Sequence, residues 1–369
     1  LATVSLWAHS AWGAGVNYAM QLEKSAQSLL LDIARAGERL VAVGERGHIL
    51  YSEDEGITWI QAKVPTDAML TRLFFFDDLQ GWAVGHDGNV LHSRDGGVSW
   101  VLQRDGVASQ SAINEQRAGR ALGNLEALRE QLAVASEADV IALESAVDDA
   151  QWALDTAREV LDEPLYAPPL MDVWFSSPER GWAAGAYGVL LHTANGGRDW
   201  ADWSYKVDSP DELHLNGVVG DSQGGLYLAS EWGLVFVSAN GGEAWQSVES
   251  GYEGSFFGLV HNFKSGSLFA YGLLGTIYRS RDEGKSWEEL DSGVSASLFG
   301  AHASDDTLVF VGQGGTATFT EDDGDNFSPQ IQALHDGLFG VAPLGEGEFI
   351  ATGEGGSRKL ESASGSKAP

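Results

Sequence analysis

The sequence predicts an all-β fold, a seven-bladed β-propeller, interrupted by an inserted antiparallel α-helical hairpin. Two observations lead to this prediction. A turn motif returns about every 40 residues, and one long segment between two copies has a helical period instead. Glycine occurs 47 times and tryptophan 13 times, as expected of a chain with many tight turns. A period near 40 with four short strands per unit is typical of propeller blades.

The repeated turn has the pattern Ser/Thr-x-Asp/Asn-x-Gly-x-x-Trp/Phe and occurs six times. Its Asp or Asn side chain can accept hydrogen bonds from backbone N–H groups of the turn, and its Gly can adopt a positive φ. The aromatic residue begins the next strand and is expected to pack between neighbouring blades. We therefore interpret these Asp-box residues as structural: Asp54, Gly56, Trp59, Asp95, Gly97, Trp100, Asn195, Gly197, Trp200, Asn240, Gly242, Trp245, Asp282, Gly284, Trp287, Asp322, Gly324 and Phe327.

The second unit shows where the strands lie. Residues 70–76 form the expected inner strand a, 81–84 strand b, 89–93 strand c and 100–103 the outer strand d, with glycines in the b–c turn. A seventh unit has candidate strands at 337–342, 348–352 and 357–360 but neither a box nor a fourth strand. We expect residues 15–22 to supply the missing strand, because an open ring leaves an unpaired sheet edge.

The chain therefore divides into five segments. Residues 1–14 resemble the end of a secretory signal peptide, with an Ala-Trp-Gly cleavage site at 11–13, and this predicts export to the periplasm. Residues 15–107 hold blades one and two with the closing strand, 108–162 the helical hairpin, 163–360 blades three to seven, and 361–369 a flexible tail. Nothing after the signal has 18 consecutive apolar residues, so no direct membrane insertion is expected.

The insertion has a helical period. Apolar residues recur at 3–4 spacing over 118–135 and again over 140–161, and a Ser-Glu-Ala-Asp sequence between them resembles a helix cap. This pattern is typical of an antiparallel hairpin with a coiled-coil seam. Two arrangements remain open at this point: the hairpin lies flat on the propeller, or it projects as an arm that grips a partner.

Charge and composition exclude several function classes. The formal net charge of −31 repels nucleic acid and anionic lipid headgroups. The absence of cysteine excludes disulfides, thiolate metal sites and a cysteine nucleophile. His92 and His192 occupy the same position in different blades, which are far apart, so no metal site and no cofactor are predicted.

One face of the predicted propeller is the preferred binding surface. The b–c turns and the connections between blades lie on the same face, and the hairpin is one such connection. Several residues at these turns are large or apolar, which is unusual for solvent-exposed turns. The candidate partner-binding residues are Arg46, His86, Asp87, Tyr187, Trp232, Leu274 and Glu354.

The units GWAVGHDGNVLHSRDGGVSW at 81–100 and GWAAGAYGVLLHTANGGRDW at 181–200 resemble the BNR/Asp-box propellers of the photosystem II stability/assembly factor family. This resemblance covers the repeats but not the hairpin. It implies an exported, seven-bladed propeller without enzymatic activity. Photosynthetic members chaperone a membrane-protein subunit, and some of the similar propellers of non-photosynthetic bacteria are encoded beside RND-type transporters. The resemblance thus predicts a scaffold or assembly factor that binds a membrane protein complex. The oligomeric state is not predicted.

An alternative is a glycoside hydrolase or a carbohydrate-binding propeller, because Asp boxes also occur in such proteins. A sialidase needs three arginines that converge on the substrate carboxylate. The arginines of this chain are not placed at strand starts around the ring, so they do not fit that requirement. Other glycosidases need only two carboxylates. Asp87, Glu231 and Glu354 are available at the b–c turns, so this alternative remains open.

Overall fold

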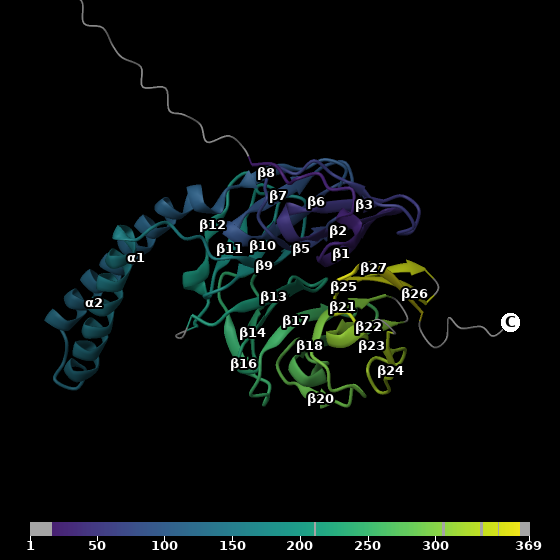
Figure 1. Ribbon diagram of the computed structural model, residues 1–369. Coiled ribbons are helices and arrows are strands. Elements are labelled where there is room, and N and C mark those ends of the chain that lie inside the picture. The colour runs from purple at the N-terminus through teal and green to yellow at the C-terminus, as the bar shows by residue number, and fades with distance from the viewer. Residues whose placement is uncertain (1–16, 210–211, 305–306, 333–334, 346, 362–369) are drawn as a thin grey trace, which may run out of the picture.

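The computed structural model describes residues 17–209, 212–304, 307–332, 335–345 and 347–361. These residues form seven antiparallel sheets arranged in a ring (Figure 1), which confirms the predicted seven-bladed propeller. Six sheets have four strands and the seventh has three. Within each sheet the strands follow one another in chain order, so every connection inside a blade is a hairpin.

The strands of blades one to three are β1 (Leu30–Ala36), β2 (Arg39–Gly44), β3 (Ile49–Ser52), β4 (Ile60–Gln61), β5 (Leu70–Phe75), β6 (Gly81–Gly85), β7 (Val90–Ser93), β8 (Val101–Arg104), β9 (Leu170–Phe175), β10 (Gly181–Gly185), β11 (Leu190–Thr193) and β12 (Ala201–Asp202). Those of blades four and five are β13 (Leu215–Gly220), β14 (Leu226–Ser230), β15 (Leu234–Ser238), β16 (Gln246–Glu249), β17 (Phe256–His261), β18 (Leu268–Gly272), β19 (Ile277–Ser280) and β20 (Glu288–Leu290). Blades six and seven contain β21 (Leu298–Ala303), β22 (Leu308–Gly312), β23 (Thr316–Thr320), β24 (Ser328–Ile331), β25 (Leu338–Gly345), β26 (Glu348–Gly353) and β27 (Gly356–Glu361).

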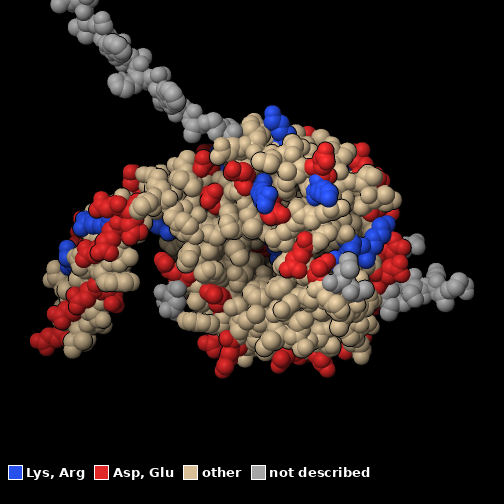
Figure 2. Space-filling model, in the orientation of Figure 1, with Lys and Arg blue, Asp and Glu red and all other residues tan. Residues whose placement is uncertain are grey.

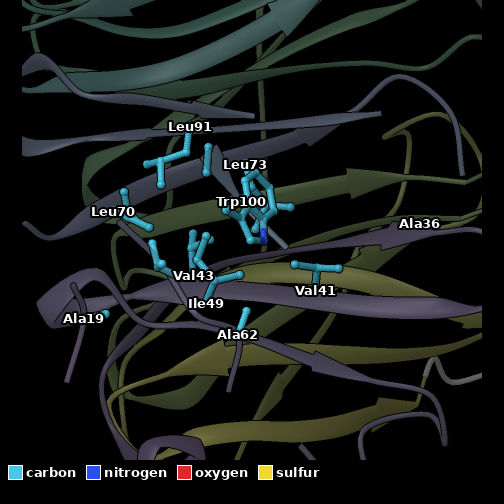
Figure 3. Packing of buried hydrophobic residues seen from close by; sticks show 12 residues of the cluster. Ala19, Ala36, Val41, Val43, Ile49, Ala62, Leu70, Leu73, Leu91 and Trp100 are labelled. Atoms are coloured by element: carbon cyan, nitrogen blue, oxygen red, sulfur yellow. The ribbon is translucent and has the colours of Figure 1, made fainter. Parts of the chain in front are cut away.

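The hydrophobic core lies between adjacent blades. Figure 3 shows the cluster between blades one and two, where Val41 and Ile49 of the first blade meet Leu73 and Trp100 of the second. Trp100 is the aromatic residue of the second Asp box, and its indole Nε1 donates to the carbonyl of Gly97 at 2.9 Å. It therefore both closes its own turn and fills the contact between the blades.

The repeated Gly-Trp-Ala-x-Gly sequence has a steric cause at both of its ends. A Cβ on Gly81 would lie 2.4 Å from the ring of Phe75 on the neighbouring strand. A Cβ on Gly85 would lie 2.1 Å from the carbonyl oxygen of Met69, although the φ of Gly85 is an ordinary extended 177°. Strand b thus carries glycine at both ends because strand a approaches too closely for any side chain.

The predicted closing strand is wrong for the described part of the N-terminal segment. Residues 15 and 16 lie outside the described residues. From residue 17 on the segment runs along blade one, where the amide of Ala19 donates to the carbonyl of Val64 at 3.0 Å and Gln21 Nε2 to that of Ala62 at 3.1 Å. Strand β4 has only two residues, so the edge of blade one is free to take this segment.

Blades one and seven instead meet through side chains. Ile350 packs with Leu30 and Leu40, and Trp59 Nε1 donates to Ser357 Oγ at 3.1 Å. The short helix η1 (Ser25–Gln27) contacts the beginning of β27. Ring closure between the described residues therefore depends on packing and isolated hydrogen bonds rather than on a shared sheet. The predicted flexible tail, 361–369, lies outside the described residues from 362 on.

The insertion forms two helices, α1 (Gly106–Ala133) and α2 (Val140–Asp162), as the periodicity predicted. Asp105 caps α1 by accepting from the amide of Ala108 at 3.0 Å. Leu125, Ala150 and Leu154 form the buried seam between the helices. At 1.5 Å per residue, α1 is about 42 Å long. In Figure 1 the distal part of the hairpin extends beyond the propeller as an arm.

Candidate functional site

The b–c turns share an unusual backbone conformation. Short helical turns at η2 (Glu45–Gly47), η3 (His86–Gly88), η5 (Leu273–Gly275) and η6 (Gln313–Gly315) have a left-handed middle residue, and the turns of blades three and four do the same. These residues, with their φ values, are Arg46 (56°), Asp87 (58°), Tyr187 (56°), Trp232 (55°), Leu274 (56°) and Gly314 (65°). Five of the seven candidate residues thus occupy one equivalent position in successive blades.

Glycine is the residue best suited to this position, because a Cβ makes the left-handed conformation cost roughly 1–2 kcal/mol. Of these six left-handed positions, only the one in blade six holds glycine. Tyr187, Trp232 and Leu274 are instead 51%, 60% and 77% exposed. Their backbones are strained while their apolar side chains remain in solvent, so neither local conformation nor core packing explains them.

Tyr187 belongs to a polar and aromatic cluster at the foot of α2. Its ring contacts Tyr166, with the centroids 6.5 Å apart, and His214, with the centroids 5.0 Å apart. His214 Nδ1 lies 3.4 Å from the carboxylate of Glu231, the residue before Trp232. The cluster therefore connects the end of the helical insertion with the b–c turns of blades three and four. Tyr166 and His214 could not be found from the sequence, because both lie in connections that have no repeat pattern.

Glu45, Glu231 and Glu354 have the same structural role in three blades. Each begins a b–c turn, and each carboxylate accepts a hydrogen bond from a backbone N–H at or just before the start of strand a in the same blade. The donors are the amides of Leu29, His214 and Gly337, at 3.3, 2.9 and 3.0 Å. Two of the three carboxylates available for a glycosidase are thus engaged in stabilising the ring.

The remaining candidates lie on blades one and two. Arg46 is exposed and forms a loose ion pair with Glu45 at 3.8 Å. His86 and Asp87 are both exposed. The base of α1 passes directly beside this turn, since Arg104 donates to the carbonyl of Gly88. The insertion therefore starts on the b–c face, as its place between two blades predicted.

The insertion is then tied to the rim of blade three. Arg117 Nε and Arg120 Nη2 donate to the buried carboxylate of Asp202 at 3.1 and 2.7 Å. The guanidinium of Arg120 also lies 4.5 Å from the ring centre of Tyr205. Burial alone would raise the pKa of Asp202, but Arg117 and the hydrogen bonds hold that pKa below its usual value. The proximal part of α1 is thus docked on the propeller, and the distal part of the hairpin forms the arm.

The central channel opens on the same face. One residue from each inner strand, always the second, surrounds a cavity of about 200 Å³: Leu31, Thr71, Met171, Asn216, Phe257, Phe299 and Phe339. Arg72 reaches across below them. It donates to the carbonyl of Phe299 at 3.0 Å and lies 3.6 Å from Asp32. Burial raises the pKa of the neighbouring Asp172 to about 6, although Arg72 opposes this shift.

The opposite face carries the Asp boxes, whose polar groups bond within their own turns. In the second box Ser93 Oγ donates to Asp95, and Asp95 also accepts from the amide and hydroxyl of Ser99 at 2.9 and 2.6 Å. The other five boxes repeat the core of this pattern. Among the described residues no group of three His, Asp or Glu side chains could hold a metal ion. His92 stacks on Trp82 with the centroids 4.7 Å apart, and burial lowers its pKa to about 4.

Comparisons with known proteins agree with this architecture. A family model described as photosynthesis system II assembly factor YCF48 matches residues 152–295. The photosystem II assembly lipoprotein Ycf48 of Synechococcus sp. (strain CC9902) is 31% identical over 93 residues, which are 25% of this chain. The alignment spans only 26% of the length of that relative.

Solved structures share the fold over nearly the whole chain. A structure titled YCF48 bound to D1 peptide has a TM-score of 0.61 and 14% identity, covering 94% of this chain and 96% of the other. YCF48 from Cyanidioschyzon merolae has a TM-score of 0.59 and 14% identity over 94% and 98% of the two chains. The WD40 propeller domain of Doa1 has a TM-score of 0.60 at 9% identity, over 94% and 96%.

No helix among the described residues is long and apolar enough to cross a membrane. The family match over residues 152–295 and the relative that is 31% identical over 93 residues confirm the resemblance of this chain to the BNR propeller family of photosystem II assembly factors.

Proposed function

We propose that this protein is a non-catalytic, periplasmic scaffold or assembly factor that binds a membrane protein complex through its b–c face. One observation carries the proposal. Tyr187, Trp232 and Leu274 project apolar side chains into solvent from backbone positions that glycine would occupy without strain. Strained residues that do not serve packing are typical of binding sites. Aromatic residues are also enriched at the centres of protein interfaces.

The relatives support the kind of partner. One solved relative is titled as bound to a D1 peptide, and the curated relative is named an assembly lipoprotein. The net charge of −31 of this chain favours a partner whose docking segment is basic. A photosystem subunit and a component of an RND-type transporter complex are both possible sources of such a segment. A catalytic role is not favoured, since Glu231 and Glu354 bond to the backbone.

The experiment is a crosslinked pull-down from native membranes with the full chain. The test variant replaces Tyr187, Trp232 and Leu274 by glycine, which suits their left-handed backbones and preserves the fold. We expect recovery of the partner complex to fall about tenfold or more, as is usual when interface anchors are removed. The control is Ile57→Ser on the Asp-box face, where the side chain is 75% exposed, similar to Leu274. Equal recovery with the triple variant and the wild type would overturn the proposal.

A further inference from the structure

A groove along the helical arm lies outside the repeated part of the molecule. It is a cavity of about 480 Å³ between the two helices and the connection that leads into blade four. Figure 2 shows the corresponding hollow between the arm and the propeller. Its lining comes mostly from α1 and α2: Asn114, Arg117, Ala121, Trp152, Ala153, Thr156, Ala157, Val160 and Glu212. Trp152 is 72% exposed at its edge.

The spacing of the lining fits a helix as occupant. On α2, Ala153, Ala157 and Val160 follow one another at intervals of four and three residues, so they form one stripe. On α1, Arg117 and Ala121 face them at the same interval. Small side chains let a third helix approach to the usual 8–10 Å between axes. On α2 the buried seam of the hairpin uses other residues, so the stripe of Ala153, Ala157 and Val160 is free for a partner, whereas Ala121 of α1 packs against the seam as well as lining the groove.

The apolar surface continues from the arm to the b–c face. Beyond Val160, the exposed residues Leu161, Leu165 and Tyr166 follow at the end of α2 and in the irregular segment after it. Tyr166 then contacts Tyr187, the first of the strained turn residues. Exposed apolar residues thus lead along the chain from the groove to the b–c face, with the acidic residues Asp162 and Glu163 between them.

Charge identifies the chemistry of the occupant. Residues 106–163 contain twelve acidic and four basic residues, a net charge of −8. Two of the four basic residues, Arg117 and Arg120, are neutralised by Asp202. Figure 2 shows acidic side chains along the arm. A second copy of this chain would bring two such surfaces together, whereas a basic helix would be attracted.

We infer that this groove binds an amphipathic helix of the partner, with apolar residues on one face and Lys or Arg on the flanks, completing a three-helix bundle with α1 and α2. The arm is suited to this role because Asp202 holds the base of α1 at a fixed angle. The groove is thus formed before binding, which reduces the entropy that binding would otherwise lose. This inference rests on the proposed function, since it specifies how the partner of the b–c face is recognised.

The test uses the full chain and a synthetic probe: a fluorescent 18-residue peptide of Leu and Lys, with Leu at 3–4 spacing. Binding is measured by fluorescence anisotropy at 0.15 M salt, where long-range attraction is screened beyond about 8 Å. We expect Trp152→Ser to weaken binding at least tenfold. We expect Ala153→Gln with Ala157→Gln, which fills the groove without adding charge, to do the same. Ile141→Ser is the matched control, because Ile141 is 80% exposed on the same helix but does not line the groove.

A shuffled peptide of the same composition is the second control, and we expect it to bind at least tenfold more weakly. Equal binding of both peptides, or equal losses for Trp152→Ser and Ile141→Ser, would show charge attraction alone and overturn the inference. A dimer that depends on Trp152 in sedimentation experiments would also overturn it, in favour of a second copy. The peptide experiment does not involve the native partner. Its failure would therefore leave the proposal for the b–c face intact, and that proposal is tested separately by the pull-down.

Discussion

The two faces of this propeller use their turns in opposite ways. On the c–d face six Asp boxes keep the same residue types, because the Ser or Thr hydroxyl donates to the Asp or Asn oxygen and accepts from the glycine amide. On the b–c face the backbone conformation repeats but the side chain does not, and the left-handed position holds arginine, aspartate, tyrosine, tryptophan, leucine or glycine. On the c–d face both the side chains and the backbone conformation are therefore constrained by the fold. On the b–c face the fold constrains only the backbone conformation.

Left-handed residues also occur in the boxes, and they sharpen the contrast. Glu55, Glu283 and Asp323 have φ values near 60°. Each interacts within the molecule: Glu283 with Lys285 at 2.7 Å, Glu55 with Lys359 at 3.6 Å, and Asp323 with the hydroxyls of two serines. Those contacts offset part of the backbone strain locally. Trp232 and Leu274 have no such compensation in the described structure, so an external partner is the simplest reason for them.

The largest effect is expected from Asp95→Ala in the second box. The change removes three hydrogen bonds to a carboxylate and leaves the amide of Ser99 without its acceptor. We expect the free energy of unfolding to fall by about 2–3 kcal/mol in denaturant titrations. Asp87→Gly, in the b–c turn of the same blade, is the control; because glycine suits the left-handed conformation of residue 87, it is expected not to lower the free energy of unfolding. Similar losses in both would remove the distinction between the two faces.

A second test introduces strain where the chain avoids it. Gly314→Leu places in blade six the residue that blade five has at Leu274. A Cβ on Gly314 meets no atom within 4 Å, so only the backbone conformation opposes the change. We expect a loss of about 1–2 kcal/mol in unfolding free energy. An unchanged stability would show that the left-handed position is not strained, and the argument from Tyr187 and Trp232 would fail.

The fold could be predicted because blade architecture is local. The box and the glycines beside Trp82 act through neighbours within one hairpin, so their spacing alone reveals the strands. Ring closure could not be predicted. The N-terminal segment could run along blade seven or along the short edge of blade one, and which of the two it contacts depends on packing across the ring. The role of Glu354 was also hidden, since its hydrogen bond to Gly337 joins residues 17 positions apart.

The docking of α1 on blade three could not be predicted from the sequence for the same reason. Arg117 and Asp202 are 85 residues apart in sequence, and no periodic pattern links them. The candidate position Trp232, by contrast, had a signal in the sequence, although its left-handed conformation did not. The residue is large and apolar at a tight turn, where small or polar residues are usual, and this made the turn unusual.

A third prediction concerns pH and the boxes. Burial alone would raise the pKa of Asp95, but hydrogen bonds from Ser99 and Ser93 lower it below 3.8. A depressed pKa means that the carboxylate stabilises the fold above the unfolded pKa and that this stabilisation is lost as pH falls through the folded pKa. Asp95→Asn is expected to cost about 1 kcal/mol at pH 7. The difference in unfolding free energy between Asp95→Asn and the wild type, measured by denaturant titration, should shrink as pH falls below 3.8. A difference that stays constant down to pH 2 would contradict this prediction.

The smallest effect should have the opposite sign. Leu274→Gly relieves the left-handed strain without removing any packed contact, because Leu274 is 77% exposed. We expect unfolding free energy to rise by about 0.5–1 kcal/mol. Ile57→Gly, at a similarly exposed position with no positive φ, should lower it by about as much, since glycine there only adds freedom to the unfolded chain. A residue whose removal stabilises the fold but weakens the recovery of a partner serves binding at the expense of stability. If both substitutions destabilise equally, Leu274 is an ordinary turn residue and the b–c face loses its distinguishing property.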